Sequence, residues 1–369
     1  MDFRLGDDQE LLVATARDFL RKHCPPELLD ELAGDERNFP DHLWRAMAEL
    51  GWTGLLVPAE YGGSEGSLLD VILLLEEMGR VCLPGPYLHS AVVATSLIAT
   101  AGSDAQRRSL LPALVNGERR CALALLEESG ELVAEAMTTW VDGDGLRGHK
   151  LFVKDAHLAH DLLVVARQGA GLTLILLESA RPGLTVAPMP SMTDEKLFEV
   201  IFSEVKIHPG DVLGAPGQGA DALAQAVRLG ALGRSAEMLG CAQHILDLVV
   251  EHTKSRVQSG QPIGAFQAIQ HACADLLRNV ESARPLLYSA AWKVEQGQAV
   301  APAVAMAKSY VGDTCLAVAR KAHQVFGAIS YCEEHPLHRF HKRIIAARLD
   351  FGEVALHQET IARAIGLSC

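Results

Sequence analysis

The sequence predicts an α+β protein with a helical N-terminal domain, a middle antiparallel β domain and a C-terminal helical bundle. Apolar residues recur at helical spacing up to about residue 114, and short apolar or alternating runs fill residues 119–208. Long, Ala-rich helical patterns return from about residue 219. A chain of 369 residues is long enough for two or three domains. We place them at 1–117, 118–215 and 216–369.

The N-terminal elements follow from helix signals. Residues 7–23 begin with acidic and end with basic side chains, which suits the helix dipole. A second helix should end at Gly51, a typical C-terminal cap, before a Pro- and Gly-containing loop over 52–63. Further helices are expected over 68–81 and up to about Asn116.

The middle region has the pattern of short strands. Runs at 161–166, 172–177 and 184–187 are apolar or alternating, and residues 198–202 alternate apolar and other side chains. Gly, Pro or Asp residues separate them. This spacing is typical of a compact antiparallel sheet or barrel.

The C-terminal region is predicted to be a bundle of long helices. Residues 298–325 are rich in Ala and can be buried on most sides, and Pro285 should kink or break the helix that contains it. One apolar face, at helical spacing, is formed by Met238, Cys241, Ile245 and Leu248.

Composition argues against several classes of function. With 33 Lys and Arg against 46 Asp and Glu, the formal charge is −13, so nucleic acid and anionic lipid are not expected as partners. The acidic N-terminus lacks the features of a secretory signal, and no apolar run reaches the ~18 residues of a membrane helix. We therefore expect a cytoplasmic, soluble protein without a membrane partner.

No metal site is expected. The eight Cys residues are scattered without a CxxC pair, which is typical of small buried side chains in a reducing compartment. His335, His338, His341 and His357 form a loose group whose spacing matches no metal motif. We interpret these His residues as hydrogen-bonded or exposed.

The segment 256–271 is the best candidate for chemistry. Arg256 is a permanent cation suited to a phosphate, and the Gly and Pro residues after it let the backbone approach a ligand. Gln267 offers an amide donor and a carbonyl acceptor. From the residues alone, an ordinary connector between two helices with a solvated Arg remains the alternative.

Several motifs, in this order, resemble the acyl-CoA dehydrogenase family over essentially the whole chain. They are GWTGLLVPAEYGG at 51–63, LRGHKLFV at 146–153, VLG at 212–214 with Gly217 and Gly219, HQVFG at 323–327 and EHPL at 334–337. The resemblance implies a C-terminal four-helix bundle and a tetramer that binds FAD across subunits. It also implies that Arg256 meets the FAD pyrophosphate, that Gln267 contacts the ADP half, and that Gln324 and Gly327 approach from the neighbouring subunit.

The implied activity is FAD-dependent α,β-desaturation of an acyl-CoA in fatty acid or steroid degradation. In the family, a carboxylate base removes the α-proton while a hydride leaves Cβ for the flavin, and donors at the thioester oxygen stabilise the developing enolate. The implied partners are the acyl-CoA substrate and an electron-transfer flavoprotein or similar acceptor.

Departures from the family fall at positions assigned to the flavin. Leu126 and Lys154 replace family hydroxyl residues, Phe152 replaces Trp, Ser259 replaces Phe, and Ala328 replaces a second Gly. Together these changes indicate an altered flavin pocket.

The catalytic base position is also changed. An ungapped count from Gln324 places it at Phe351, followed by Gly352 as in the family, and neither can act as a base. Glu353 is the tentative catalytic residue, although neighbours on a helix point roughly 100° apart. At Val227, where some relatives carry the base, there is no carboxylate.

Three functions follow from the resemblance. The chain is a self-sufficient acyl-CoA dehydrogenase, or a catalytically incomplete subunit that completes the FAD site of a heterotetramer for bulky, steroid-type substrates. The third is a related flavin oxidase, monooxygenase or thioester dehydratase.

Overall fold

The chain forms two compact units in the computed structural model, which describes residues 4–35 and 39–367. The helical unit contains the described residues up to Leu29, Leu68–Leu83 and the chain from Ala231 onward. The mixed unit contains the described residues of Asp30–Ser67 and Pro84–Gly230. The three-domain boundaries at 117 and 215 stay a prediction.

Helices occupy the chain before the sheet, as the periodicity predicts. They are α1 (Asp7–His23), α2 (Pro26–Ala33), α3 (Asp41–Glu49), α4 (Leu68–Arg80), α5 (Thr95–Ala101) and α6 (Asp104–Val115), with a π-helical segment at Tyr87–Ala94. Gly51 has the positive φ of 77° expected after the end of α3. The predicted loop at 52–63 contains two short 3₁₀ turns, Trp52–Gly54 and Ala59–Tyr61.

One sheet of eight strands fills the middle of the chain. Its strands are β1 (Cys121–Ala124), β2 (Trp140–Asp142), β3 (Gly145–Lys154), β4 (Asp161–Gln168), β5 (Gly171–Glu178), β6 (Leu184–Met189), β7 (Leu197–Lys206) and β8 (Val212–Leu213). The order is β6-β7-β3-β2-β4-β5-β8, with β1 also paired to β4. One buried core cluster contains residues of β1, β3, β4, β5 and β7.

The sheet is antiparallel except at β4, which pairs in parallel with β1 and β2. Other strands separate these partners along the chain, and only such crossovers permit parallel pairing. The predicted antiparallel sheet therefore needs this one correction. Two register shifts interrupt the β3–β7 ladder, one of them between Lys150 and Val153.

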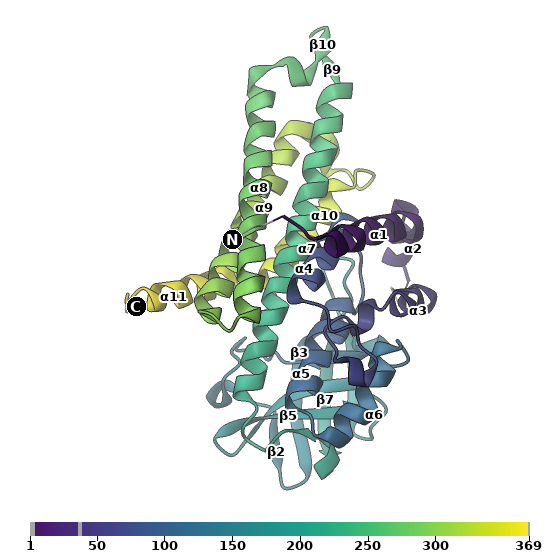
Figure 1. Ribbon diagram of the computed structural model, residues 1–369, viewed down its shortest axis with the longest axis vertical. Helices are drawn as coiled ribbons and strands as arrows, with labels where there is room; N and C mark the ends of the chain where they lie inside the picture. The colour runs from purple at the N-terminus through teal and green to yellow at the C-terminus, as the bar shows by residue number, and fades with distance from the viewer. Residues whose placement is uncertain (1–3, 36–38, 368–369) are drawn as a thin grey trace. The chain divides into compact units, whose positions relative to one another are not determined.

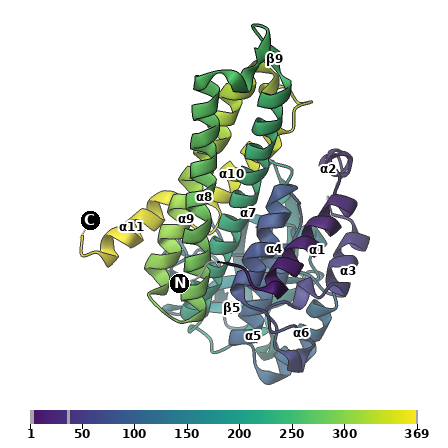
Figure 2. The ribbon, with the colours of Figure 1, turned by 45° about the horizontal axis from the view of Figure 1, so that its top comes forward.

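The C-terminal part is helical, as predicted. It contains α7 (Ala220–Ser255), α8 (Gln267–Glu295), α9 (Val300–Phe326), α10 (Leu337–Leu349) and α11 (Val354–Ala364), with the hairpin β9 (Val257–Gln258) and β10 (Gln261–Pro262) joining α7 to α8. Figures 1 and 2 show α8 and α9 side by side. The sequence predicts a kink or a break at Pro285, and α8 passes through it as one helix, which excludes the break.

Small residues bring helices of the helical unit close together. Three residues of the predicted α7 face, Met238, Cys241 and Ile245, are fully buried, whereas Leu248 is only partly buried. A side chain at Gly240 would collide with the backbone carbonyl of Glu76 in α4. This close crossing explains why glycine stands there.

No helix in the part of the chain that the structure describes has the length and apolarity to cross a bilayer. Five of the seven described Cys residues are buried, and all seven are free thiols. Within residues 4–35 and 39–367, no group of three or more His, Cys, Asp or Glu could hold a metal ion.

Candidate functional site

The hairpin after α7 presents Arg256 at the end of the helical unit. The Arg256 amide donates to the carbonyl of His252, and its own carbonyl accepts from Ile263 on the far side of the hairpin, at 2.8 Å each. The two turn residues, Ser259 and Gly260, have φ of 52° and 78°, as a type I′ hairpin requires. This turn fixes the backbone beside Arg256, whose side chain is exposed.

Gln267 is the first residue of α8, directly after the hairpin. Its exposed side chain lies beside the unpaired amide groups of a helix N-terminus, which carry partial positive charge. Arg256 and Gln267 therefore lie on one short, rigid connection, as the sequence motif predicts.

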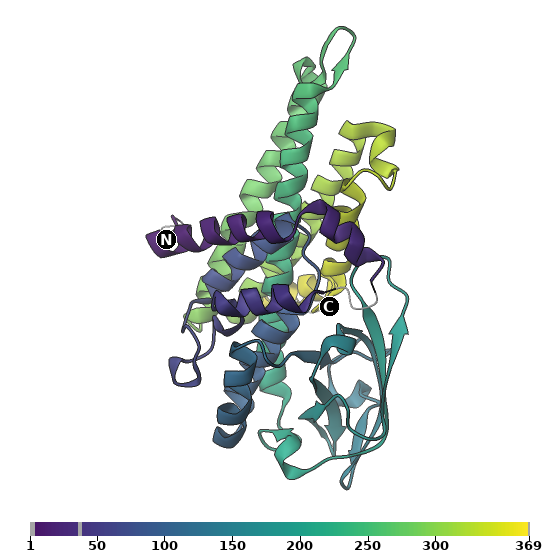
Figure 3. The same cartoon turned by 90° about the vertical axis from the view of Figure 1, so that its right-hand side faces the viewer.

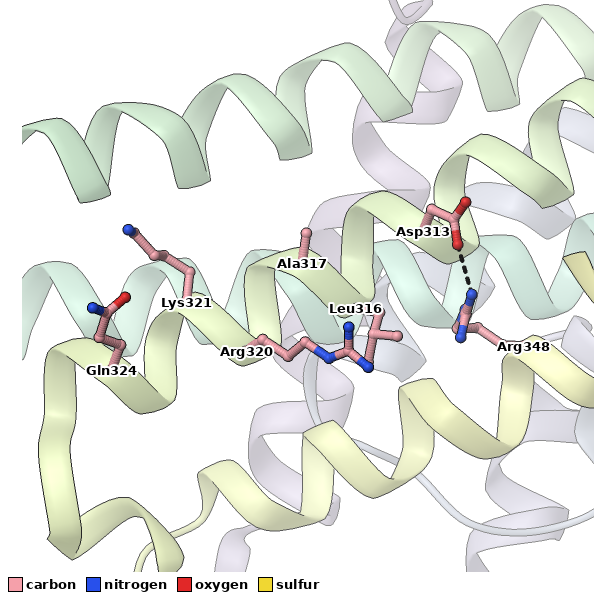
Figure 4. A pocket seen from close by; sticks show the side chains of 7 residues that line it. All are labelled: Asp313, Leu316, Ala317, Arg320, Lys321, Gln324 and Arg348. Atoms are coloured by element: carbon pink, nitrogen blue, oxygen red, sulfur yellow. Dashed lines mark hydrogen bonds and ion pairs between the residues drawn. The ribbon is translucent and has the colours of Figure 1, made fainter.

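Gln324 lies on the last turns of α9 and lines a surface groove of about 600 Å³. Figure 4 shows its side chain on the same side of α9 as that of Lys321, with Arg320 nearby. Farther along the groove, Arg348 is held by Asp313 at 2.6 Å. Gln324 therefore shares this groove with Lys321 and Arg320.

Gly327 ends α9 with φ of 72° and begins a 3₁₀ turn, Gly327–Tyr331. No atom lies within 4 Å of where a Cβ would stand on Gly327, so this side of the residue is open, while its amide donates to the His323 carbonyl and its carbonyl accepts from Ser330. A ring contact of 4.6 Å between His252 and Phe326 joins this end of α9 to the end of α7. All four predicted cofactor residues are thus carried by the same unit, near helix ends that touch.

These residues fit the diphosphate of FAD. Arg256, Gln267 and Gln324 supply hydrogen-bond donors, and none of the three side chains bonds to another described residue. A permanent guanidinium, amide donors and nearby Lys and Arg charges together suit an anionic oxygen ligand.

In the mixed unit, a buried ion pair links Glu127, the residue after Leu126, to strand β3, which also carries Phe152 and Lys154. Lys150 Nζ donates to Glu127 Oε1 at 2.7 Å, and the Thr138 hydroxyl donates to the same carboxylate at 2.6 Å. Burial opposes ionisation of Glu127, but the bonds from Lys150 and Thr138 still lower its pKa to about 2. Burial lowers the pKa of Lys150 to about 8.

Lys154, which replaces a family hydroxyl, is also paired. Its ammonium lies 2.9 Å from a carboxylate oxygen of Glu195, and both side chains are largely buried. Phe152, two residues earlier, lies in the β3 bulge with φ of 57° and is half-exposed. The new cation is therefore neutralised, and the bulge sets the aromatic ring at the surface of the unit.

The turn between α10 and α11 contains the predicted base position. Phe351 is buried and has φ of 55°, which is strained for a bulky residue, and Gly352 follows with φ of 98°. Asp350 accepts from the buried Arg234 at 2.7 Å. His357 lies 3.2 Å from the Phe351 carbonyl.

Glu353, the tentative catalytic residue, is exposed and stands just before α11. Its side chain makes no cap hydrogen bond. The neighbouring carboxylate of Asp350 is committed to Arg234. A catalytic role for Glu353 stays a prediction.

The sequence analysis did not assign a role to three groups of residues near these sites. Arg320 and Lys321 precede Gln324 by four and three residues, a helical spacing that could have indicated their shared surface. Glu195 lies 41 residues from Lys154, so no local signal joins them. His323 neighbours Gln324, but its side-chain partners are Ser330 in the following 3₁₀ turn and His341 in α10.

Known proteins match this arrangement over the whole chain. The N-terminal domain model of acyl-CoA dehydrogenases matches residues 6–118, and the C-terminal domain model matches residues 217–366. A short-chain-specific acyl-CoA dehydrogenase of Megasphaera elsdenii is 31% identical over 92% of this chain and 93% of the relative. An NADH-dependent acryloyl-CoA reductase of Anaerotignum propionicum is 29% identical over 99% of this chain and 96% of the relative.

Solved structures share the fold. Butyryl-CoA dehydrogenase of Megasphaera elsdenii superposes with a TM-score of 0.91 at 28% identity, covering 99% of this chain and 100% of that one. PigA with FAD and proline gives a TM-score of 0.92 at 25% identity over 100% of both chains. A chain of the ChsE4–ChsE5 complex of Mycobacterium tuberculosis gives a TM-score of 0.91 at 26% identity, and the match covers 100% of both chains.

Proposed function

We propose that this chain, which belongs to the acyl-CoA dehydrogenase family, holds FAD in an oxidoreductase that acts on the Cα–Cβ bond of acyl-CoA thioesters. The observation that carries the proposal is the exposed donor set of Arg256, Gln267 and Gln324. These side chains are free of other described partners, whereas the buried cations Lys154 and Arg234 are paired with carboxylates.

FAD, when bound, supplies the acceptor for the hydride that leaves Cβ. Arg256 would bind the diphosphate and neutralise its charge, and the rigid hairpin would keep the guanidinium in place. Gln267 would hold the ADP half from the first turn of α8. Gln324 and Gly327 would contact the FAD of a neighbouring subunit, which makes a tetramer part of the proposal.

The base position favours a second, more specific candidate: a subunit that needs a related chain to supply the catalytic carboxylate. Phe351 fills the position with an apolar ring, and Asp350 is tied to Arg234. A structural neighbour is itself a complex of two different chains, which supports a heteromer here. Glu353 remains the in-chain alternative. The acyl-CoA substrate and an electron-transfer flavoprotein or similar acceptor complete the proposal.

The test compares the chain alone with the chain co-expressed with a related chain that carries Glu at the position of Phe351. Each preparation is examined for the absorbance of bound FAD. The bleaching of the FAD absorbance is then measured with short straight-chain and with bulky steroid-type acyl-CoAs. The reverse reaction is measured with reduced flavin and enoyl-CoA. We expect FAD to bind, and turnover to require the related chain.

Each result decides between the candidates. FAD binding with turnover by the chain alone would refute the partner-subunit candidate. If neither preparation binds FAD, the proposal as a whole fails. An Arg256→Ala variant that binds FAD as well as the unchanged chain would remove the donor set from the site.

A further inference from the structure

The turn between α10 and α11 is held from both of its sides. Asp350 ends α10 with φ of −73° and ψ of 137°. Phe351 and Gly352 follow with φ of 55° and 98°, so two successive residues have positive φ. α11 comes next and is part of the yellow segment that leads to the C-terminus in Figure 3.

The anchor before Phe351 is an ion pair with α7. Nε of Arg234 donates to Oδ2 of Asp350 at 2.7 Å, and Nη1 of Arg234 donates to Glu237 in the same helix. The side chain of Arg234 is 3% exposed and that of Asp350 is 14% exposed. Because this buried guanidinium is bonded to two carboxylates, it has little freedom to move, and Asp350 is held against α7.

The anchor after Phe351 is a hydrogen bond with α11. Nε2 of His357 lies 3.2 Å from the carbonyl oxygen of Phe351. A carbonyl oxygen can only accept, so Nε2 carries a proton and donates it. A Cβ at Gly352 would lie 2.9 Å from the same nitrogen, which is closer than side chains tolerate. Glycine is therefore required there for space as well as for its φ.

The last turn of α10 is fixed as well. The ammonium of Lys308, on α9, is fully buried and donates to the carbonyl oxygen of Ala347. One turn of chain thus has contacts with α7, α9 and α11, all within the helical unit.

The anchors before and after Phe351 bracket one backbone bond. The angle φ of Phe351 is the rotation about its N–Cα bond, which has the Asp350 peptide on one side and the Phe351 carbonyl on the other. With both sides held, the neighbouring helices set this angle. They can therefore impose a positive φ that a bulky residue disfavours. The ion pair is the stronger anchor, because charge-assisted hydrogen bonds are roughly twice as strong as neutral ones.

The direction of the side chain at position 351 depends on this angle. Rotation about the N–Cα bond moves Cβ relative to the held Asp350. In the observed conformation the side chain of Phe351 is buried. A return of φ to the negative region would point Cβ elsewhere. The turn therefore directs the residue at 351 inward.

We propose that Arg234 is a positioning residue: through Asp350 it holds residue 351, the base position of the family, in the conformation that turns its side chain inward. Because the role of position 351 belongs to the proposed function, this inference rests on it. The turn is then a preserved seat for a general base, and only the carboxylate is missing.

The first test needs no FAD. Amide hydrogen exchange of residues 350–354 is measured in Asp350→Ala and Asp350→Asn and corrected for intrinsic rates. Asp350→Ala removes the anchor but leaves Arg234 paired with Glu237, whereas Asp350→Asn keeps an oxygen that accepts from Arg234. We expect exchange to be at least about tenfold faster in Asp350→Ala and within about threefold of the unchanged chain in Asp350→Asn.

Asp247→Ala is the matched control. Asp247 also accepts from an Arg at 2.7 Å in the helical unit, and Arg80 keeps a second carboxylate, Glu77. This variant should leave the exchange of residues 350–354 within about twofold. Equal exchange in Asp350→Ala and the unchanged chain would overturn the proposal. Equal acceleration in Asp247→Ala would also overturn it, because the effect would then be a general loss of stability.

The second test installs the missing carboxylate. Phe351→Glu is prepared without the related chain, and its turnover is measured with acyl-CoA and an artificial electron acceptor. We expect turnover at least about 10²-fold above that of the unchanged chain, the lower end of what a general base contributes. Phe351→Gln, which has the same shape without the charge, should stay inactive.

The anchor is then removed from the active variant. Asp350→Ala in the Phe351→Glu background should lower kcat by about tenfold or more and change KM by less than about threefold, since a base acts in the transition state. Asp350→Asn in the same background should keep most of kcat. A change in KM alone would contradict a positioning role.

The outcomes separate this inference from the proposed function. If Phe351→Glu binds FAD but gains no turnover, position 351 is not a seat for the base and the positioning role is refuted. If no preparation binds FAD, the proposed function fails, while the exchange test still decides whether Arg234 holds the turn. The exchange test also decides alone if Phe351→Glu does not fold.

Discussion

The exposed end of the helical unit and the charged interior of the mixed unit use polar side chains in opposite ways. At the helical end, Arg256, Gln267 and Gln324 are open to solvent and have no described side-chain partner. In the mixed unit, Lys150 and Lys154 are buried against Glu127 and Glu195. The first set is available to a ligand, whereas the charges of the second set are already paired within the protein.

The difference shows that residue type alone does not indicate a ligand site. Lys154 and Arg256 are both cations at positions that the family resemblance assigns to FAD. Only Arg256 keeps its charge free, because a carboxylate from the loop before β7 neutralises Lys154. A cation that is already neutralised within the protein has less charge to offer a ligand.

The largest expected effect is on stability, from Lys150→Met. It removes the ammonium but keeps similar volume, and leaves the Glu127 carboxylate buried without its cation. We expect the free energy of unfolding to fall by about 3 to 5 kcal/mol at pH 7, measured by denaturant titration. Lys206→Met, at a side chain 70% exposed, should change it by less than about 0.5 kcal/mol.

The pH dependence of this effect has a defined sign. The pKa of Glu127 in the folded protein, about 2, is below its ordinary value of 4.5, so the pair stabilises the protein above that value and less as the pH falls towards 2. The difference in free energy of unfolding between wild type and Lys150→Met should therefore shrink below about pH 4.5. A constant difference would show that Glu127 is not the group responsible.

Arg256→Ala should weaken FAD binding by about ten- to a hundredfold, because a hydrogen bond to a charged group contributes about 1.5 to 3 kcal/mol. The dissociation constant is measured by flavin fluorescence. Lys254→Ala, two residues away on an exposed side chain that pairs with Glu251, is the control and should change it less than about twofold. Equal losses in both variants would mean that only general charge matters.

Glu353→Gln should leave turnover of the active preparation within about twofold, since its exposed carboxylate is not expected to reach the substrate. Steady-state assays with acyl-CoA measure this. A general base contributes about 10²- to 10⁴-fold. A loss of that size would identify Glu353 as the base and make a partner's carboxylate unnecessary.

The smallest effect is expected in the hairpin beside Arg256. Ser259 has a positive φ in a type I′ turn, where Asn is favoured and β-branched residues are strained. Ser259→Asn should raise the free energy of unfolding by up to about 0.5 kcal/mol and so raise the melting temperature slightly. Ser259→Val should lower the melting temperature. Calorimetry without FAD separates the two, and equal melting temperatures would contradict the assigned turn.

Much of the architecture could be predicted from local patterns. Helical spacing located α1, α4 and α9, short apolar runs located β4 and β5, alternation located β7, and Gly51 marked the end of α3. These predictions succeeded because periodicity and capping act over a few residues. The parallel pairing of β4 with β1 joins strands that are far apart in the chain, and local patterns did not predict it. At Pro285 the local pattern left a kink or a break open, and the structure shows an unbroken helix.

The sequence by itself determined the family resemblance, the order of helices and strands, and the four residues proposed for FAD. Only the tertiary structure decided which polar residues are free. Lys154 lies 41 residues from Glu195, and Arg234 lies 116 residues from Asp350. Hydrogen bonds and ion pairs form between groups that are close in space, and folding sets those distances independently of the separation along the chain.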